Sequence, residues 1–325
     1  MTPSRLTLDD LRAARRQLDG RIVTTPVHEL DGPMVEAALA PGTRVLLKLE
    51  LLQCTGSFMS RGALINVLRL GPDERRRGVC MVSAGNHAIA TAYAASCLGI
   101  SARVVMPASA NPLRIARCRL YGAEVELAPD IHAAFRRLEE IRGAEGRALI
   151  HPFEGPEVAL GTGTLGLEWL EQAPDLEAVI VPIGGGGLAA GLSAAIKLLK
   201  PGCEVIGVEP FGADTMYQSR VAGRPVGIER VATIADSLGA PFALPWSFAL
   251  CQAHVDDLVR VDDAELVVAM RFLMEQARLA VEPAGAAATA ALLGPLRTRL
   301  AGRRVGVMVS GTNLDAGSYA RLIAG

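Results

Sequence analysis

The chain has 325 residues, half of them hydrophobic, and a formal net charge of -1 at pH 7. That length suits about two packed domains. The charge provides no basic excess for nucleic acid or an anionic membrane surface, and no acidic tail for a basic partner. We find no run of about 18 uncharged apolar residues, so no membrane-spanning helix is expected.

The first segment is expected to form an amphipathic helix. Thr7 is its expected N-cap, Leu8, Leu11, Ala14 and Leu18 share one face, and Gly20 ends it. This pattern is not that of a signal peptide. The six cysteines form no C-x-x-C pair and fit no zinc spacing, which favours buried free thiols and a cytoplasmic location.

Apolar segments rich in β-branched residues then alternate with segments of helical period. Strands are expected at 44–50, 78–83, 102–107, 124–129, 178–184, 204–210 and 304–310, and helices at 131–146 and 188–200. Continuous apolar strands separated by helices are typical of a mainly parallel sheet covered on both faces, so the expected fold class is α/β. Ligands of such folds bind in the strand-to-helix loops.

Two of these loops carry small and polar residues. Thr55-Gly56-Ser57 precedes a helix whose first turn holds Met59, and alone it would be taken for a capped helix start. In Met81–Ala90, Ser83 and Asn86 can cap the following helix, whose free N–H groups suit a carboxylate. His87 is a candidate ligand or base, although a lone histidine in a first helical turn is more often structural.

The third loop is a run of glycines between a strand and a helix. It comprises Gly184, Gly185, Gly186, Gly187 and Leu188. Successive glycines allow a sharp turn that aims N–H groups at an anion, with the helix dipole behind them, so the loop predicts a phosphate cradle; a tight turn is the alternative. The spacing fits neither a dinucleotide fingerprint nor a Walker A loop.

Together the three loops resemble the signatures of pyridoxal-phosphate (PLP) enzymes of fold type II, in particular threonine/serine dehydratases and serine racemases. Lys48-x-Glu50 with Thr55–Ala63 resembles the segment around the PLP lysine, Ser83–Ala88 the substrate-carboxylate loop, and Gly184–Leu188 the phosphate loop. Matches over essentially the whole length include Thr25-Pro26, His151-Pro152-Phe153, Val208-Glu209-Pro210, Thr233–Asp236, Glu282–Ala286 and Ser310–Asn313.

The resemblance implies two α/β domains with mainly parallel twisted sheets, helices on both faces and PLP in the cleft between them. The larger, PLP-binding domain is expected to combine 1–77 with 151–325, and the smaller, substrate-binding domain to span 78–150. A homodimer is carried over as an expectation. The end of the chain soon after Ser310 leads us to expect no C-terminal regulatory domain.

The resemblance also implies roles for single residues. Phe58 is expected to pack against the cofactor ring, Asn86 to bond its hydroxyl group, and Ser310 to face its nitrogen and leave it largely neutral. Gly184, Gly185, Gly186, Gly187 and Leu188 are expected to hold the phosphate. The expected substrate-binding residues are Ser83, Ala84, Gly85, Asn86 and His87.

The pattern breaks at its catalytic position. Relatives read T-G-S-F-K where this chain has Met59, and a thioether can neither form an imine nor move a proton. Of the other lysines, Lys197 and Lys200 are expected at the far end of a helix in solvent, and only Lys48 to have any access to the cleft. PLP is therefore expected to bind non-covalently or as a substrate imine.

Further departures refine the expectation. Ile89 and Thr162 replace glutamines that are common in relatives, which favours natural divergence over a constructed Lys→Met variant. Ala84 stands where racemases place a serine base, which argues against racemisation. Thr215 stands where some relatives have an acidic metal ligand near Glu209 and Ala213, so no metal is expected, although Asp214 is adjacent.

Three functions follow. The first is a dehydratase-type lyase, whose family reaction removes water from a hydroxy amino acid and yields a 2-keto acid and ammonia. The second is a non-catalytic protein that binds PLP and an amino acid. The third is an enzyme repurposed for lysine-independent chemistry.

Overall fold

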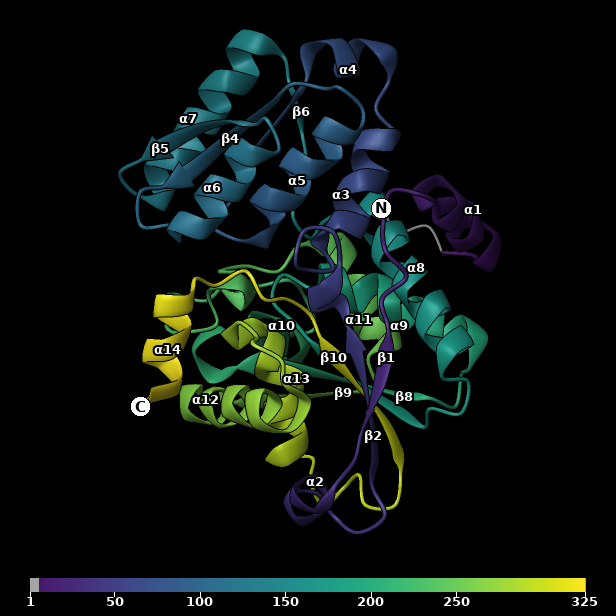
Figure 1. Ribbon diagram of the computed structural model, residues 1–325. Helices are drawn as coiled ribbons and strands as arrows, with labels where there is room; N and C mark the ends of the chain where they lie inside the picture. Colours follow the sequence, from purple (N-terminus) through teal and green to yellow (C-terminus); the bar gives the residue numbers. More distant parts are fainter. Residues whose placement is uncertain (1–5, 325) are drawn as a thin grey trace.

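Two β-sheets organise residues 6–324, which the computed structural model describes (Figure 1). The larger sheet has the order β1-β2-β10-β7-β8-β9 and the smaller β5-β4-β3-β6. Only β1 runs antiparallel to its neighbour; every other pairing is parallel. The strands are β1 Val27–Leu30, β2 Arg44–Leu49, β3 Val79–Val82, β4 Ala102–Pro107, β5 Glu124–Ala128, β6 Ala148–Leu149, β7 Ala178–Pro182, β8 Glu204–Pro210, β9 Asp257–Val261 and β10 Arg304–Val309.

Helices surround both sheets, so the expected α/β class is confirmed. They are α1 Leu8–Leu18, α2 Pro33–Ala38, α3 Met59–Leu68, α4 Pro72–Arg77, α5 Asn86–Cys97, α6 Pro112–Leu120, α7 Ile131–Glu145, α8 Pro156–Gln172, α9 Gly187–Leu199, α10 Thr215–Ala222, α11 Pro245–His254, α12 Asp263–Phe272, α13 Pro283–Leu293 and α14 Ala316–Ala324. All seven expected strands and both expected interior helices are present.

The N-terminal helix also forms as expected. Thr7 caps α1 and exchanges hydrogen bonds with Asp10 in a capping box. The buried residues of α1 are Leu11, Ala14 and Leu18. Residues 1–5, at the start of the N-terminal segment whose pattern is not that of a signal peptide, lie outside the described residues.

The larger sheet is covered on both faces, which explains its apolar strands. All five residues of β7 are buried. The alanine-rich α13 packs on β7 and β10, and α9 packs on β7 and against α8. Small side chains let α13 lie close to the strands, and ten of its eleven residues are buried. The strand-to-helix loops therefore stand on a rigid core.

Helix α3 joins the two halves of the molecule. It packs against α8 beside the larger sheet and against α5, which follows the first strand of the smaller sheet. Met59 is the first residue of α3. It therefore belongs to the helix that lies between the two sheets (Figure 1).

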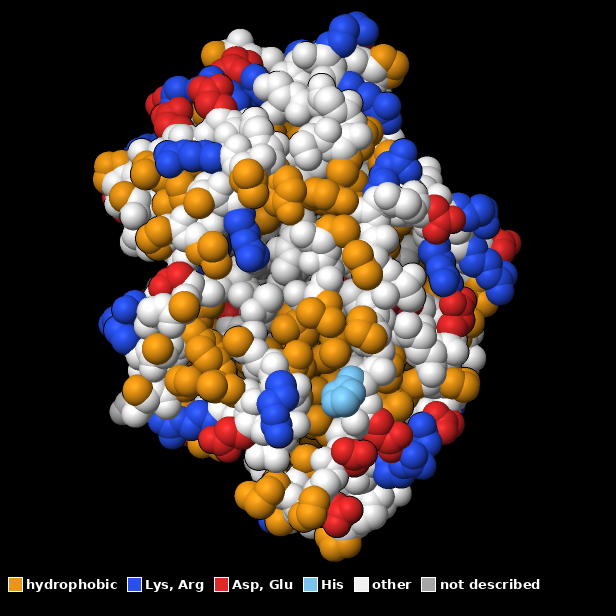
Figure 2. All heavy atoms as spheres, in the orientation of Figure 1, with side chains coloured by type: hydrophobic (Ala, Val, Ile, Leu, Met, Phe, Trp, Pro, Cys, Tyr) orange, Lys and Arg blue, Asp and Glu red, His pale blue; other side chains and the backbone are white. Residues whose placement is uncertain are grey.

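The distribution of surface charge and the length of the helices agree with the net charge and the apolar pattern of the sequence. On the face shown in Figure 2, acidic and basic side chains are interspersed. Among residues 6–324, no helix is long and apolar enough to cross a membrane.

Candidate active site

The loop that leads to Met59 is held by the segment after β10. Ser57 and Gly311 form an isolated antiparallel bridge, and the Phe58 N–H donates to the Ser310 carbonyl at 3.2 Å. The Asn313 side chain donates to the Thr55 carbonyl at 2.8 Å. Residues more than 250 positions apart are thus fixed side by side, and Phe58, Met59 and Ser310 share one site.

Asn86 ties the second loop to the same place. Its Nδ2 lies 2.5 Å from Glu282 Oε1, and its Oδ1 accepts from Asn313 Nδ2 at 2.6 Å. Asn86, Glu282 and Asn313 are all buried. Asn86, at the start of α5, is therefore oriented by Glu282, which precedes α13, and by Asn313, which follows β10.

The capping expected for α5 is wrong in detail. The N-cap is Gly85, and no side chain caps the helix. Ser83 Oγ instead accepts from the Gly85 N–H at 3.0 Å within the loop, while Asn86 turns to Glu282. Because no side chain takes the first N–H groups of α5, the helix N-terminus beside Ala84 suits an anionic group.

The glycine loop has the form of an anion cradle. Gly186 has φ +91°, which favours glycine, and it precedes α9 directly. A Cβ at Gly187 would lie 2.6 Å from Phe153 Cα, and one at Gly185 would overlap the Phe153 ring. Within the described chain, no hydrogen bond takes up the backbone N–H groups of residues 184–188.

Met59 lies in the wall of a narrow pocket. The residues that line it are Phe58, Met59, Gly62, Ala63, His87, His151, Pro152, Val158 and Thr162. Thr162 also donates to the Gly187 carbonyl at 2.9 Å, and the His151 ring packs edge-on against Phe153 at 4.7 Å. The pocket therefore adjoins the glycine loop.

The two histidines of this pocket differ in which ring nitrogen is engaged in a hydrogen bond. His87 Nε2 donates to the Ile150 carbonyl at 3.0 Å, so its proton is there and Nδ1 keeps the lone pair. His151 Nδ1 accepts from the N–H groups of Phe153 and Glu154, so its lone pair is occupied. Burial lowers the pKa of His151, and that of His87 to about 4.

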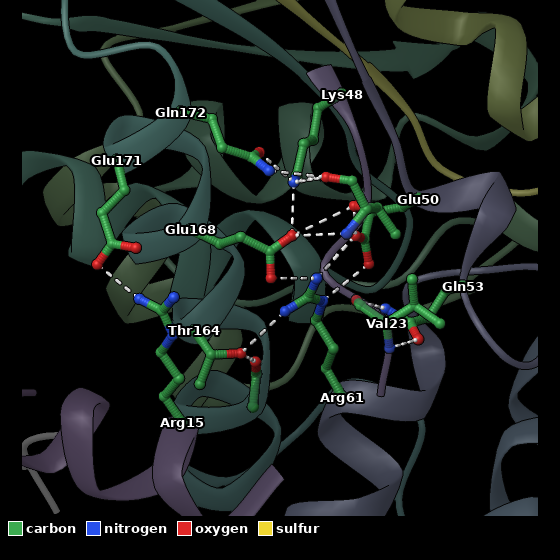
Figure 3. A network of polar contacts seen from close by, with 12 residues as sticks. Arg15, Val23, Lys48, Glu50, Gln53, Arg61, Thr164, Glu168, Glu171 and Gln172 are labelled. Carbon is green, nitrogen blue, oxygen red and sulfur yellow. Dashed lines mark hydrogen bonds and ion pairs between the residues drawn. The ribbon is translucent and has the colours of Figure 1, made fainter. Parts of the chain in front are cut away.

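Lys48 does not supply the missing amine. Its Nζ is completely buried, lies 2.5 Å from Glu168 Oε1, and contacts the Thr25 carbonyl and Gln172 Oε1 at 2.7 Å each (Figure 3). Glu168 also accepts from Arg61 at 2.9 Å. These contacts turn Lys48 towards α8 and hold it in a buried ionic network.

The network links α3 to the strand that precedes it. Arg61, two positions after Met59, makes paired hydrogen bonds of 2.8 Å with Glu50. Burial opposes the charge of Glu168, yet Arg61 and Lys48 outweigh it and lower the pKa of its carboxyl group. Two cations, Lys48 and Arg61, thus balance two carboxylates, Glu50 and Glu168, in this buried network (Figure 3).

The two remaining lysines lie at the far end of α9, as expected, but both are partly buried rather than free in solvent. Lys197 Nζ contacts the Cys203 carbonyl at 2.7 Å and Asp256 at 2.6 Å. Lys200 Nζ donates to the Pro174 carbonyl at 2.7 Å. All three lysines of the sequence are therefore bound elsewhere.

These residues fit PLP, as the resemblance implies. The cradle offers unpaired N–H groups at a helix N-terminus, as a phosphate requires. Ser57 Oγ, completely buried beside Phe58, has no hydrogen-bond partner in the described chain. Ser310 is buried, with its Oγ 3.4 Å from the Ala284 carbonyl.

Sequence reasoning missed one central residue, Arg114. From α6 it reaches Glu282 at 3.2 Å, Asp236 at 2.5 Å and the Asn313 carbonyl at 2.8 Å, and its Nη1 lies 3.4 Å from the Ala84 carbonyl. It joins the smaller-sheet half to the larger. In the sequence it is one of three arginines in this helix, and nothing there distinguishes it from a surface arginine.

Glu209 and Asp214, considered above as metal ligands, are both engaged by protein groups. Glu209 accepts from the N–H groups of Met216 and Tyr217 at 2.8 and 2.7 Å. Asp214 pairs with Arg260 at 2.8 Å, whose guanidinium stacks over the Tyr217 ring. Within residues 6–324, no group of three His, Cys, Asp or Glu side chains is arranged to hold a metal.

Comparison with known proteins gives consistent matches over the whole chain. The family described as "Pyridoxal-phosphate dependent enzyme" matches residues 19–311. A phenylserine dehydratase from Ralstonia pickettii is 54% identical, covering 97% of this chain and 96% of that protein. An L-threonine ammonia-lyase from Thermotoga maritima is 39% identical, covering 98% and 78%. The structure of maize serine racemase superposes with a TM-score of 0.91 at 33% identity, covering 98% and 97%.

Proposed function

The chain belongs to the pyridoxal-phosphate dependent enzyme family, and on this premise we propose that its cleft binds PLP and a β-hydroxy amino acid without a covalent bond from protein to cofactor. The observation that carries the proposal is the combination of a preserved phosphate cradle with Met59 at the lysine position. Relatives named for phenylserine, threonine and serine support the substrate class, because all three amino acids carry a β-hydroxyl group.

Each site residue has a proposed task. Gly184, Gly185, Gly186, Gly187 and Leu188 bind the phosphate through their N–H groups. Phe58 packs on the ring, Asn86 bonds its hydroxyl group and Ser310 faces its nitrogen. The loop of Ser83, Ala84, Gly85, Asn86 and His87 receives the substrate carboxylate at the N-terminus of α5.

The proposed reaction is removal of water from the amino acid, which leads to a 2-keto acid and ammonia. Bound PLP supplies the sink for the electron pair left on Cα. The protein orients the substrate within the cleft. Ala84 has no hydroxyl group for a second proton transfer, which supports elimination rather than racemisation.

A second candidate is a binding protein without turnover. The presence of Met59 favours it, because this residue cannot act as the base. Lys48, Lys197 and Lys200 cannot replace it, since all three are bound elsewhere. An absorbance spectrum separates the two. Purified protein is mixed with PLP, and then with L-serine, L-threonine or phenylserine, beside a Met59→Lys variant.

We expect the wild-type protein to change the visible spectrum of PLP only after amino acid is added, and the variant to change it beforehand. Release of keto acid by the wild-type protein identifies the lyase, and binding without release identifies the binding protein. If neither protein binds PLP, the cofactor assignment is wrong and the glycine loop serves another anion.

We also propose the division into a domain of 1–77 with 151–325 and a domain of 78–150. The smaller sheet, built from residues 79–149, supports it. A homodimer and a cytoplasmic location remain proposals. All six cysteines are free thiols, which supports a reducing compartment, and sedimentation of the purified protein tests the dimer.

A further inference from the structure

With Met59 in place of a lysine, another group must move the substrate proton. The lysine of relatives would both hold the cofactor and act as the base. The first task passes to non-covalent contacts in our proposal. The second requires a lone pair near the position that the lysine would occupy.

His87 is the residue of the pocket that meets this requirement. It lines the same pocket as Met59, is 3% exposed, and its Nδ1 has no hydrogen-bond partner in the described chain. The bond from Nε2 to the Ile150 carbonyl fixes the tautomer that leaves Nδ1 unprotonated. An unpartnered buried acceptor is costly unless a ligand uses it.

The neighbouring histidine cannot take this role in its present arrangement. His151 lines the pocket as well, but its Nδ1 accepts from two backbone N–H groups, at 3.3 and 3.0 Å. Its remaining nitrogen carries the proton and can only donate. The two histidines that line the pocket therefore differ: His87 has an unpaired acceptor, Nδ1, whereas His151 has only an N–H group left.

We propose that His87 Nδ1 takes the proton from Cα of the bound amino acid, in place of the lysine that Met59 replaces, and either returns it to Cα or passes it to the departing β-oxygen; this inference rests on the proposed function. The Cα–H bond breaks, its electron pair stays on Cα, and the proton passes to Nδ1. The Cβ–O bond then breaks, Cα and Cβ form a double bond, and the departing oxygen takes the proton from Nδ1 as water. The imidazole returns to its neutral form, and no other reactant is consumed.

The buried position of His87 suits such a shuttle. Burial keeps the ring neutral at physiological pH, so the lone pair is available. The same burial makes the protonated ring a strong acid, which returns its proton readily to the departing oxygen. Helix α5 holds the residue one position after Asn86, which the proposed function places on the cofactor.

The test follows exchange of the Cα proton of L-serine in D₂O by ¹H NMR, with PLP and each protein. His87→Gln retains an N–H group for the Ile150 carbonyl but lacks the base. His132→Gln, at an exposed position of α7, is the matched control. We expect exchange by the wild-type protein and the control, and a loss of roughly 100-fold or more in His87→Gln.

A second readout needs neither a variant nor turnover. The ¹⁵N resonance of His87 Nδ1 is expected to shift when PLP and L-serine are added, while that of His151 Nδ1 keeps its backbone-bonded value. An unchanged His87 resonance overturns the inference, as does full exchange in His87→Gln or wild-type exchange no faster than with PLP alone. In those cases the spectral change of PLP still occurs and the proposed function stands; if that change is absent too, both are overturned.

Discussion

Lys48 Nζ lies 2.5 Å from Glu168 Oε1, with the two side chains 0% and 5% exposed. Glu168 also pairs with Arg61 at 2.9 Å, so one buried carboxylate serves two cations, one of them two positions after Met59. The one lysine near the site in sequence is thereby committed to holding α8, β2 and α3 together (Figure 3).

Replacing Glu168 with Gln is expected to lower the free energy of unfolding by about 3 kcal/mol, because two buried cations lose their shared carboxylate. The control is Glu171→Gln, one turn away, whose side chain is 60% exposed and pairs with Arg15 on the surface. It is expected to cost about 1 kcal/mol or less. Urea unfolding measures both, and equal midpoints would contradict a structural role for the network.

Acid is expected to destabilise the protein through His87. The ordinary pKa of 6.5 applies in the unfolded chain, whereas burial lowers it to about 4 in the folded protein. Between these values only the unfolded chain binds the proton, so the free energy of unfolding falls as pH decreases from 6.5 to 4, by up to about 3 kcal/mol. His87→Gln removes this contribution.

The measurement is the pH dependence of urea unfolding for the wild-type protein, His87→Gln and His132→Gln. The slope between pH 6.5 and 4 should be flatter in His87→Gln alone. The same slope in all three proteins would show that His87 is protonated normally in the folded state.

The glycine cradle makes a separate prediction. Gly187→Ala places a Cβ 2.6 Å from Phe153 Cα, which forces the glycine loop and the start of α9 away from Phe153. We expect PLP affinity to fall at least about tenfold, since overpacking typically costs 1–3 kcal/mol. Gly202→Ala has no atom within 4 Å of the new Cβ and should bind PLP normally. Equilibrium dialysis measures the PLP affinity of both variants. Normal binding by Gly187→Ala would show that the glycine loop does not hold the cofactor.

Much of the fold could be predicted because its strands are buried on both faces. Strands such as β7 are continuous apolar runs between turn residues, which sequence displays directly. Strand β6 was missed because it has only two residues, and β1 and β9 because they are partly exposed and carry polar residues, so no apolar run marks them.

The site was predictable as three loops but not as a set of contacts. Lys48 was thought able to approach the cleft, yet alternation along β2 puts it on the face of Leu46, towards α8. Its partner Glu168 lies 120 positions later in an apolar helix, and Arg114 meets Glu282 across 168 positions. Such pairings depend on how the halves pack, which local pattern does not encode.

The most direct test of the central claim is the mass of the protein with PLP, first under native conditions and then after borohydride reduction and denaturation. We predict that the wild-type protein carries PLP in the native spectrum and loses it on denaturation even after reduction. Met59→Lys should retain it on residue 59. An adduct on Lys48 in the wild-type protein, or no PLP in its native spectrum, would contradict the claim that this cleft binds PLP without a lysine.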